Sequence, residues 1–225
     1  MTAWETIELA RADTAAVAQQ LRAHPYVAAV ESGRLPRADL ARFAGEQWHI
    51  IASDLRSVAH LVTRFGNTPA RSFFLDVLAG ERAAFEALDP LAVGLGLEPG
   101  ELRNLDPLAG AHAYTCYMAW LGLYGSAADV AAAYLVNFPA WGENCGRLGA
   151  SLQSRYGLKA AHVAFFDLFA APVAGFEAAA TAVIEADLAA GASPTEVRRA
   201  VRLLQAYELM YWDTLYEASF GRVEP

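Results

Sequence analysis

The sequence predicts an all-α protein, a bundle of seven or eight helices that forms a single domain over residues 1–225. Three observations support this prediction. Hydrophobic residues make up 55% of the chain, which is enough for one large core. Apolar side chains recur three and four residues apart, as they do on one face of a helix. No segment alternates apolar and polar residues between hairpin turns, so no strand is expected.

The first half of the chain predicts three helices, over residues 5–24, 36–65 and 68–90. Their ends fall at prolines or at glycine, because proline suits the first turn of a helix and prevents its continuation. A short piece over residues 26–30 follows the first helix. Residues 90–108 are rich in glycine and proline, and they predict a connector with one short helix.

The second half predicts further helices whose starts carry capping residues. Ser126, with Asp129 three residues later, forms a capping box, and Ser193-Pro194 is a typical helix start. Pro139 falls inside one helix, where it is expected to kink or break it. The predicted ranges are 109–124, 126–156, 159–169, 172–190 and 193 onward.

Composition and charge argue against several classes of partner. The formal net charge is -8, Lys159 is the only lysine and the arginines are scattered, so neither nucleic acid nor an anionic membrane surface is expected. No apolar run approaches the roughly 20 residues of a membrane span. The start of the chain lacks a signal-peptide pattern, and two cysteines are too few for a disulfide framework. The chain is therefore expected to be cytoplasmic.

Glu208 is the candidate catalytic residue. Leu204, Glu208 and Tyr211 lie three and four residues apart, so they share one helix face, and the apolar members show that this face points inward. A buried, unpaired carboxylate is costly, so Glu208 needs a partner, a proton or a ligand. Internal polar residues such as Gln47 and Asn137, among many aromatic residues, favour a pocket over a purely structural core.

No metal and no cofactor is predicted. Di-iron sites in helical bundles use two Glu-x-x-His pairs, and this chain has one, Glu46 with His49. A single-iron site with Glu46, His49 and one further carboxylate remains an alternative. Cys116 and Cys145 have no histidine at a helical neighbour position that would activate them, and they are predicted to be core residues.

Several segments together resemble a known family. Residues 207–216, Tyr-Glu-Leu-Met-Tyr-Trp-Asp-Thr-Leu-Tyr, are similar to a closing Tyr-Glu-x-x-Phe-Trp-(Asp/Glu)-x-x-Tyr motif. Residues 113–118 resemble an Ala-Tyr-Thr-x-Tyr-Met segment, and residues 126–148 resemble a long helix that ends in Gly-Glu-x-Gly-x-x-Leu. Residues 43–51 occupy the place of a Gln-Asp-Tyr segment. These are motifs of the TenA/THI-4 family, thiaminase II and related aminopyrimidine hydrolases of thiamin salvage, and the similarity spans about residues 5 to 220.

The resemblance implies a heme-oxygenase-like fold, a homo-oligomer (dimer or tetramer), and a pocket between helices for a small heterocyclic ligand. Glu208 falls on the family's catalytic glutamate, and Tyr114 falls on a tyrosine that borders the pocket. Trp141 and Tyr211 fall on aromatic pocket positions, where a flat heterocycle can stack.

Three positions depart from the family pattern. Asn137 stands where the family has its nucleophilic cysteine, and an amide cannot form a covalent intermediate. Gln47 stands where the family has an aspartate that binds the ligand, and Phe169 corresponds to a pocket tyrosine. Cys145 is eight residues from Asn137, about 12 Å along a helix, and cannot take the place of the nucleophile.

Three functions are consistent with these residues. The first is a divergent hydrolase in which Glu208 assists attack of water on an aminopyrimidine-like heterocycle, with Glu143, Glu46 or Tyr117 in a supporting or acid–base role. The second is a binding or regulatory protein that keeps the pocket without turnover. The third is an oxidase of the PqqC or CADD type, but the iron-binding Glu-x6-His spacing is absent, because the six residues after Glu81 end at Ala87 and are followed by Leu88 rather than by a histidine.

Overall fold

Ten α-helices and two 3-10 helices form the part of the chain that this computed structural model describes, residues 1–98 and 100–221, and no strand occurs there. The all-α prediction is confirmed. Eight of the α-helices have eight residues or more, and two have seven. The α-helices are α1 (Ala3–Arg22), α2 (Pro25–Glu31), α3 (Arg37–Arg64), α4 (Ala70–Glu86), α5 (Leu88–Leu95), α6 (Ala109–Tyr124), α7 (Ala127–Tyr156), α8 (Ala164–Ala170), α9 (Phe176–Ala189) and α10 (Pro194–Phe220), and the 3-10 helices are Glu101–Asn104 and Ala160–His162.

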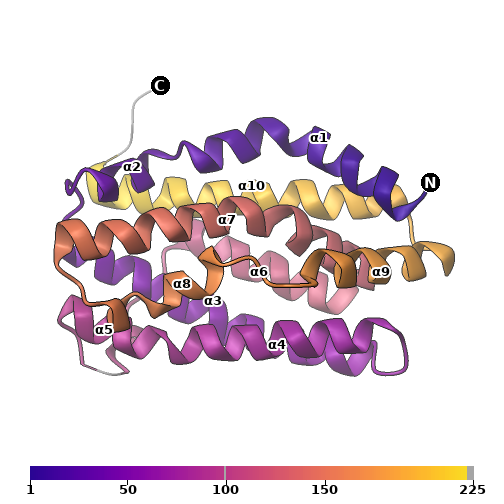
Figure 1. Cartoon of the computed structure of the whole chain (residues 1–225), viewed down its shortest axis with the longest axis horizontal. Coiled ribbons are helices and arrows are strands. Elements are labelled where there is room, and N and C mark those ends of the chain that lie inside the picture. Colours follow the sequence, from indigo (N-terminus) through magenta and orange to yellow (C-terminus); the bar gives the residue numbers. More distant parts are fainter. Residues whose placement is uncertain (99, 222–225) are drawn as a thin grey trace.

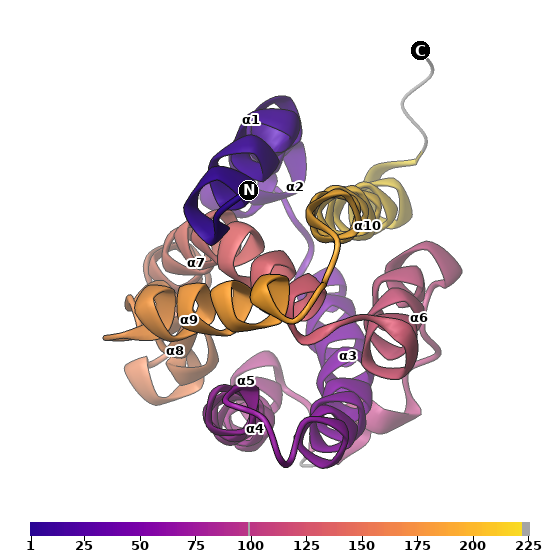
Figure 2. The same cartoon turned by 90° about the vertical axis from the view of Figure 1, so that its right-hand side faces the viewer.

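The long helices lie roughly along one direction, with α1 on one side of the bundle and α4 on the other (Figure 1). Seen along that direction, α3 lies between α4 and α6 (Figure 2). Helix α3 packs mainly against α4 and α6, whereas α10 packs against α1, α6 and α7. None of the helices in the described ranges is long and apolar enough to cross a membrane.

Helix ends follow the predicted capping residues. The Ser126 hydroxyl accepts a hydrogen bond from the Asp129 amide at 3.1 Å, and the Asp129 carboxylate accepts one from the Ser126 amide at 2.8 Å. The predicted capping box is thus confirmed, and it satisfies amides that the first turn leaves free. Ser193 accepts a hydrogen bond from the Glu196 amide at the start of α10. Gly157 ends α7 in the left-handed conformation, with a φ of 72°.

Prolines account for most of the differences from the predicted helices. Pro90 was expected to end a helix, but it lies in the first turn of α5, where its missing amide hydrogen costs no bond. Pro139 does not break α7, which continues to Tyr156. Pro172 does not begin a helix, because α9 starts only at Phe176, after Gly175 in the left-handed conformation. The predicted helix over 159–169 is divided into a 3-10 helix and α8.

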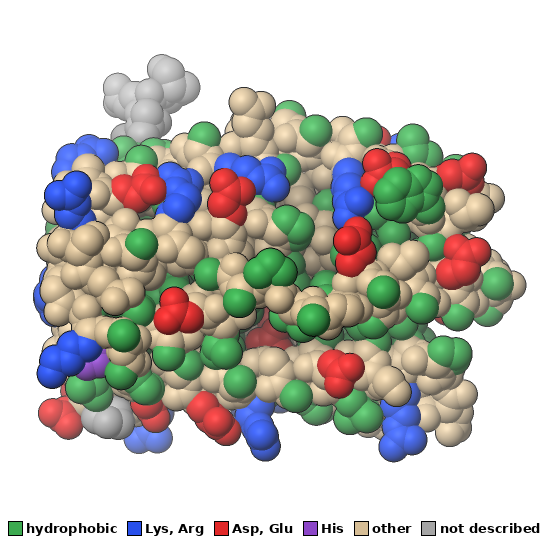
Figure 3. Space-filling view, viewed as in Figure 1, with side chains coloured by type: hydrophobic (Ala, Val, Ile, Leu, Met, Phe, Trp, Pro, Cys, Tyr) green, Lys and Arg blue, Asp and Glu red, His purple; other side chains and the backbone are tan. Residues whose placement is uncertain are grey.

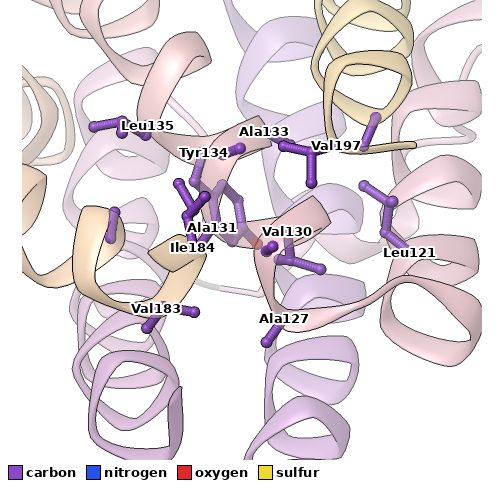
Figure 4. Close-up of a cluster of buried hydrophobic side chains, with 14 of the residues drawn as sticks. Leu121, Ala127, Val130, Ala131, Ala133, Tyr134, Leu135, Val183, Ile184 and Val197 are labelled. Atoms are coloured by element: carbon purple, nitrogen blue, oxygen red, sulfur yellow. The ribbon is translucent and has the colours of Figure 1, made fainter. Parts of the chain in front are cut away.

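The hydrophobic core consists of two clusters of buried side chains. One joins α4, α6, α9 and the first halves of α7 and α10, and Figure 4 shows part of it around Tyr134. The other joins α2, α5, α8, the first half of α3 and the second halves of α7 and α10. Tyr114 of α6 packs against both clusters. The boundary between the clusters is therefore where a cavity can open inside the bundle.

Glycines on α7 allow α8 to lie close to it. A Cβ atom on Gly142 would be 2.5 Å from the backbone carbonyl oxygen of Phe169, which is too short for any contact. A Cβ atom on Gly146 would be 3.5 Å from the Cβ atom of Ala170, an ordinary van der Waals distance. Of these two glycines, Gly142 is therefore the one that the close approach of Phe169 requires.

We expect Gly142→Ala to lower the free energy of unfolding by about 1–3 kcal/mol, because the overpacked methyl group must displace α8. Gly146→Ala is the matched control, and it should be neutral or stabilising by up to about 1 kcal/mol, since alanine favours helix more than glycine. Urea unfolding of both variants tests this. Equal effects of the two substitutions would contradict the packing described for Gly142.

Candidate functional site

A cavity of about 50 Å³ lies inside the bundle, between α3, α4, α6, α7, α8 and α10. Seven residues that the sequence predicted for the site line it: Gln47, Tyr114, Asn137, Trp141, Phe169, Glu208 and Tyr211. Six more lining residues were not among the predicted site residues: Ile50, Ile51, Asp54, Glu81, Tyr134 and Phe138. The lining is thus largely aromatic, with three carboxyl groups and two amides.

Glu208 presents one free carboxyl oxygen at this cavity. Its side chain is 2% exposed, and Oε1 accepts a hydrogen bond of 3.1 Å from the indole nitrogen of Trp212. Oε2 is buried and has no hydrogen-bond partner. Burial raises the pKa of Glu208 to about 7, although Trp212 and Asn137 act to lower it. A carboxyl group with this pKa can hold or release a proton near neutral pH.

Trp212 holds Glu208 in place because its own ring is fixed on several sides. The indole is fully buried, and its ring centroid lies 5.5 Å from that of Trp141 and 6.0 Å from that of Phe43. A third ring, Tyr26, lies 5.6 Å away. The indole N–H is therefore directed at Glu208, four residues earlier on the same helix.

Gln47 and Tyr211 are joined across the bundle. The Gln47 amide nitrogen of α3 donates a hydrogen bond of 2.8 Å to the phenol oxygen of Tyr211 on α10. Since the phenol oxygen accepts this bond, its own O–H group remains a donor. Burial raises the pKa of the Tyr211 phenol, and the Gln47 bond acts to lower it. This pair therefore fixes one aromatic wall and offers hydrogen-bonding groups beside it.

Asp54 of α3 and Glu81 of α4 are the most informative residues that sequence reasoning missed. Both side chains are buried, 3% and 8% exposed, and both line the cavity. Burial raises the pKa of each carboxyl group, and the charge of Glu81 raises that of Asp54 further. The sequence contains a signal for Asp54, because this residue lies seven positions after Gln47 and therefore two turns along the same face of α3.

Four lining residues each have a buried polar atom without a hydrogen-bond partner among the described residues. These atoms are Oδ1 of Asp54, the hydroxyl of Tyr134, Oδ1 of Asn137 and Oε2 of Glu208. Buried polar atoms in proteins are nearly always hydrogen-bonded, and each unsatisfied one is costly. An occupant of the cavity that carries hydrogen-bonding groups would satisfy these four atoms.

Three other predicted residues lie outside the cavity. Glu46 accepts a hydrogen bond from the Leu108 amide at 2.7 Å, so it holds the segment before α6. Glu143 is half exposed on α7 and pairs with Arg22 at 2.8 Å. Tyr117 lies in a surface groove between α6 and α10, where its ring stacks on Tyr207. The geometry therefore gives none of them direct access to an occupant of the cavity.

The Glu46–His49 pair is also used structurally. The His49 ring forms a 2.6 Å hydrogen bond with the carbonyl oxygen of Leu105, next to the segment that Glu46 holds. Within residues 1–98 and 100–221, no group of three or more His, Cys, Asp or Glu side chains is placed to hold a metal ion. The single-iron alternative therefore has no third ligand there.

Comparison with known proteins shows the family of the chain. The model of the TENA/THI-4/PQQC family matches residues 11–218. The chain belongs to this family. No curated protein matches the sequence itself, so the match to the family model is the sequence evidence for membership.

Several solved structures share the fold of this chain at low sequence identity. A TenA homologue from P. horikoshii OT3 has a TM-score of 0.75 and 16% identity, over 94% of this chain and 98% of that one. A TenA homolog from Pseudomonas syringae pv. tomato has a TM-score of 0.78 and 14% identity, over 93% and 92%. A domain from Shewanella denitrificans, described as having a heme oxygenase-like fold, gives 0.72 and 15%, over 93% of both chains. These likenesses confirm the predicted heme-oxygenase-like architecture.

No cysteine is among the residues that line the cavity of this family member. Cys145 is fully buried in the second core cluster, and burial raises the pKa of its thiol well above the usual range. Cys116 is exposed and lies in the groove between α6 and α10. A reaction in the cavity therefore needs a nucleophile other than a cysteine of its wall.

Proposed function

We propose that this protein binds a small nitrogenous heterocycle, similar to an aminopyrimidine, in the cavity and hydrolyses it with water as the nucleophile. Membership of the TENA/THI-4/PQQC family supports this class of ligand. The observation that carries the proposal is Glu208, a buried carboxyl group with a pKa near 7 and a free oxygen at an aromatic cavity.

The cavity wall suits a flat ring with polar edges. The Trp141 ring lies edge-on to both Phe169, at 5.8 Å between centroids, and Tyr211, at 6.4 Å. Such rings give a heterocycle faces and edges to pack against. Asn137 brings an unpaired carbonyl oxygen, which can accept a hydrogen bond from a ring amino group. The wall thereby binds and orients the heterocycle, and Glu208 accepts and donates the proton of the reaction.

In the proposed reaction, Glu208 acts first as a base and then as an acid. Its carboxylate takes a proton from water while the water oxygen forms a bond to the ring carbon that carries the amino group. The protonated carboxyl then gives that proton to the departing nitrogen, the carbon–nitrogen bond breaks, and ammonia leaves. A pKa close to ambient pH serves both steps, and it is burial that raises the pKa of Glu208 to about 7.

Incubation with thiamin and with a panel of aminopyrimidines tests this function. We expect ammonia or a cleaved pyrimidine to be released from at least one compound, detected by mass spectrometry. Release that requires folded protein supports hydrolysis. Binding of compounds without any release would favour the alternative of a ligand-binding protein, and the absence of both would refute the proposed ligand class.

Adding a thiol and a carboxylate to the cavity should increase hydrolysis. We expect Asn137→Cys with Gln47→Asp to raise the rate for aminopyrimidines by about tenfold or more, because a cysteine is a stronger nucleophile than water. Asn137→Ser with Gln47→Asp is the control, since it makes the same change of shape without a thiol. A gain that the serine control matches would exclude the thiol as its cause.

We also propose that the protein is a homo-oligomer that works in the cytoplasm. The outer surface of α6 supports self-association, because Trp120 is 50% and Tyr124 is 70% exposed there. Exposed aromatic residues that lie close together are typical of contact surfaces. Light scattering of the purified protein tests the oligomeric state, and a monomer in solution would refute the proposed homo-oligomer.

A further inference from the structure

His24 is a buried histidine outside the cavity, and both of its ring nitrogens have partners. It lies in the turn between α1 and α2, and its side chain is 3% exposed. The Nδ1 atom accepts a hydrogen bond of 3.2 Å from the Tyr26 amide, so it caps the start of α2. The Nε2 atom lies 3.0 Å from Oδ1 of Asp213 on α10. His24 therefore joins the α1–α2 turn to α10.

These two partners determine where the His24 ring carries its proton. Because Nδ1 accepts a bond from a backbone amide, the neutral ring holds its proton on Nε2 and donates it to Asp213. Burial lowers the pKa of His24, although Asp213 acts to raise it. Near neutral pH the ring is therefore uncharged, and the two hydrogen bonds fix the orientation of its plane.

The His24 ring lies beside the indole of Trp212. The centroids of the two rings are 6.2 Å apart, and Tyr216 lies edge-on to His24 at 6.4 Å. Tyr26, whose amide His24 caps, places its own ring 5.6 Å from Trp212. Both residues of the α1–α2 turn thus support the indole that donates a hydrogen bond of 3.1 Å to Glu208. A continuous series of contacts therefore joins His24 to the carboxyl group in the cavity.

Arg147 of α7 holds the turn that carries His24. Its guanidinium group donates two hydrogen bonds to the Glu31 carboxylate, at 2.8 and 2.7 Å, and a third to the backbone carbonyl oxygen of Arg22. Two parallel bonds between an arginine and a carboxylate fix the geometry of both groups. Figure 3 shows acidic and basic side chains next to each other in the upper part of the molecule, where α1, α2 and α7 lie. The histidine therefore supports Trp212 from a fixed position.

We propose that His24, held by Asp213, is a positioning residue for Glu208, because it fixes the indole of Trp212 so that the indole N–H points at the carboxyl group. This inference rests on the proposed function, in which Glu208 exchanges the proton. His24 is not among the residues that line the cavity. Its loss should therefore change the state of Glu208 through Trp212 and leave the wall that binds the heterocycle unchanged.

His24→Asn is the variant that tests the inference. The asparagine oxygen can still cap α2, whereas the ring and the contact with Asp213 are lost. The pKa of Glu208 is measured by carbon NMR of protein labelled at the glutamate carboxyl carbons, with Glu208→Gln to assign the signal. This pKa should rise by about 0.5 to 1, because the Trp212 hydrogen bond that favours the carboxylate is weakened. For the aminopyrimidine that wild-type protein hydrolyses fastest, kcat should fall roughly tenfold, with KM within about twofold.

Two sets of control variants separate positioning from a general loss of structure. His60→Asn is the same substitution at an exposed histidine of α3, and it should leave the pKa of Glu208 and kcat unchanged. Asp213 is 57% exposed, so its variants should fold. Asp213→Ala removes the acceptor for Nε2 and should raise the pKa of Glu208. Asp213→Asn keeps an oxygen that accepts this bond, and it should restore most of the wild-type pKa.

An unchanged pKa of Glu208 in folded His24→Asn protein would overturn this inference and leave the proposed function intact. A higher KM with the same kcat and the same pKa would also overturn it, since His24 would then shape the cavity instead of positioning Glu208. If His24→Asn does not fold, equal pKa values of Glu208 in wild-type and Asp213→Ala protein would overturn it. If wild-type protein hydrolyses no aminopyrimidine, the proposed function fails, and the NMR titration still decides whether His24 positions Glu208.

Discussion

Replacement of Glu208 by glutamine is expected to lower turnover of any accepted heterocycle by roughly 100-fold or more, the usual contribution of a positioned acid–base group. The amide keeps the size of the side chain and can still accept the hydrogen bond that Trp212 donates at 3.1 Å. It cannot take a proton from water or return one to the leaving nitrogen. Steady-state rates of ammonia release, measured for wild-type and variant protein, test this expectation.

Glu143→Gln is the matched control for that experiment. Glu143 is 52% exposed and pairs with Arg22 on the outside of α7, so its loss should leave the rate within about twofold and the stability nearly unchanged. Circular dichroism and unfolding curves must show that the Glu208 variant remains folded. Retained turnover in folded Glu208→Gln protein would remove Glu208 from the mechanism, whatever the cavity binds.

Stability is expected to fall as pH rises from about 4.5 to about 7, because of the buried carboxyl groups. The folded state holds the Glu208 proton up to a pKa of about 7, whereas the ordinary pKa of a glutamate side chain is 4.5. Between these values the folded state binds more protons than the unfolded state, so the free energy of unfolding decreases with pH. Glu208 alone contributes about 3 kcal/mol to this decrease, and the raised pKa of Glu81 acts in the same direction.

The contribution of Glu208 is isolated by comparing wild-type protein with Glu208→Gln. Urea unfolding at about pH 5 and about pH 8 gives the loss of stability for each protein, and the loss should be smaller in the variant by about 3 kcal/mol. Glu143→Gln should show the wild-type loss. The same pH dependence in wild-type and Glu208→Gln protein would mean that Glu208 is not buried as a neutral acid.

The order of the helices and several of their ends could be predicted because they depend on local chemistry. Ser126, Asp129 and Gly157 act on backbone groups within a few residues, so the sequence around them determines where α7 begins and ends. The role of proline was harder to predict. Pro90 and Pro139 are each compatible with helix at the place they occupy, and tertiary packing decides between a stop and a continuation.

The inward position of Glu208 could be predicted because the face of its side chain could be read from its own helix. Glu208 shares a face with Leu204 and Tyr211, and all three are buried. Glu143 lies two residues from Trp141, and residues two apart do not face the same way on a helix, which explains its place outside the cavity. The meeting of Asp54 and Glu81 could not be predicted from either helix alone. Each lies on the inner face of its own helix, and only the packing of α3 on α4 brings the two carboxyl groups to one cavity.

The central claim is that a small nitrogenous heterocycle occupies the cavity beside Glu208. The most direct test is a crystal structure of the protein with the aminopyrimidine that binds most tightly. We predict electron density for the ring between Trp141, Phe169 and Tyr211, within hydrogen-bond distance of the free Oε2 of Glu208. Density for the compound in the groove between α6 and α10, with the cavity unchanged, would contradict the claim.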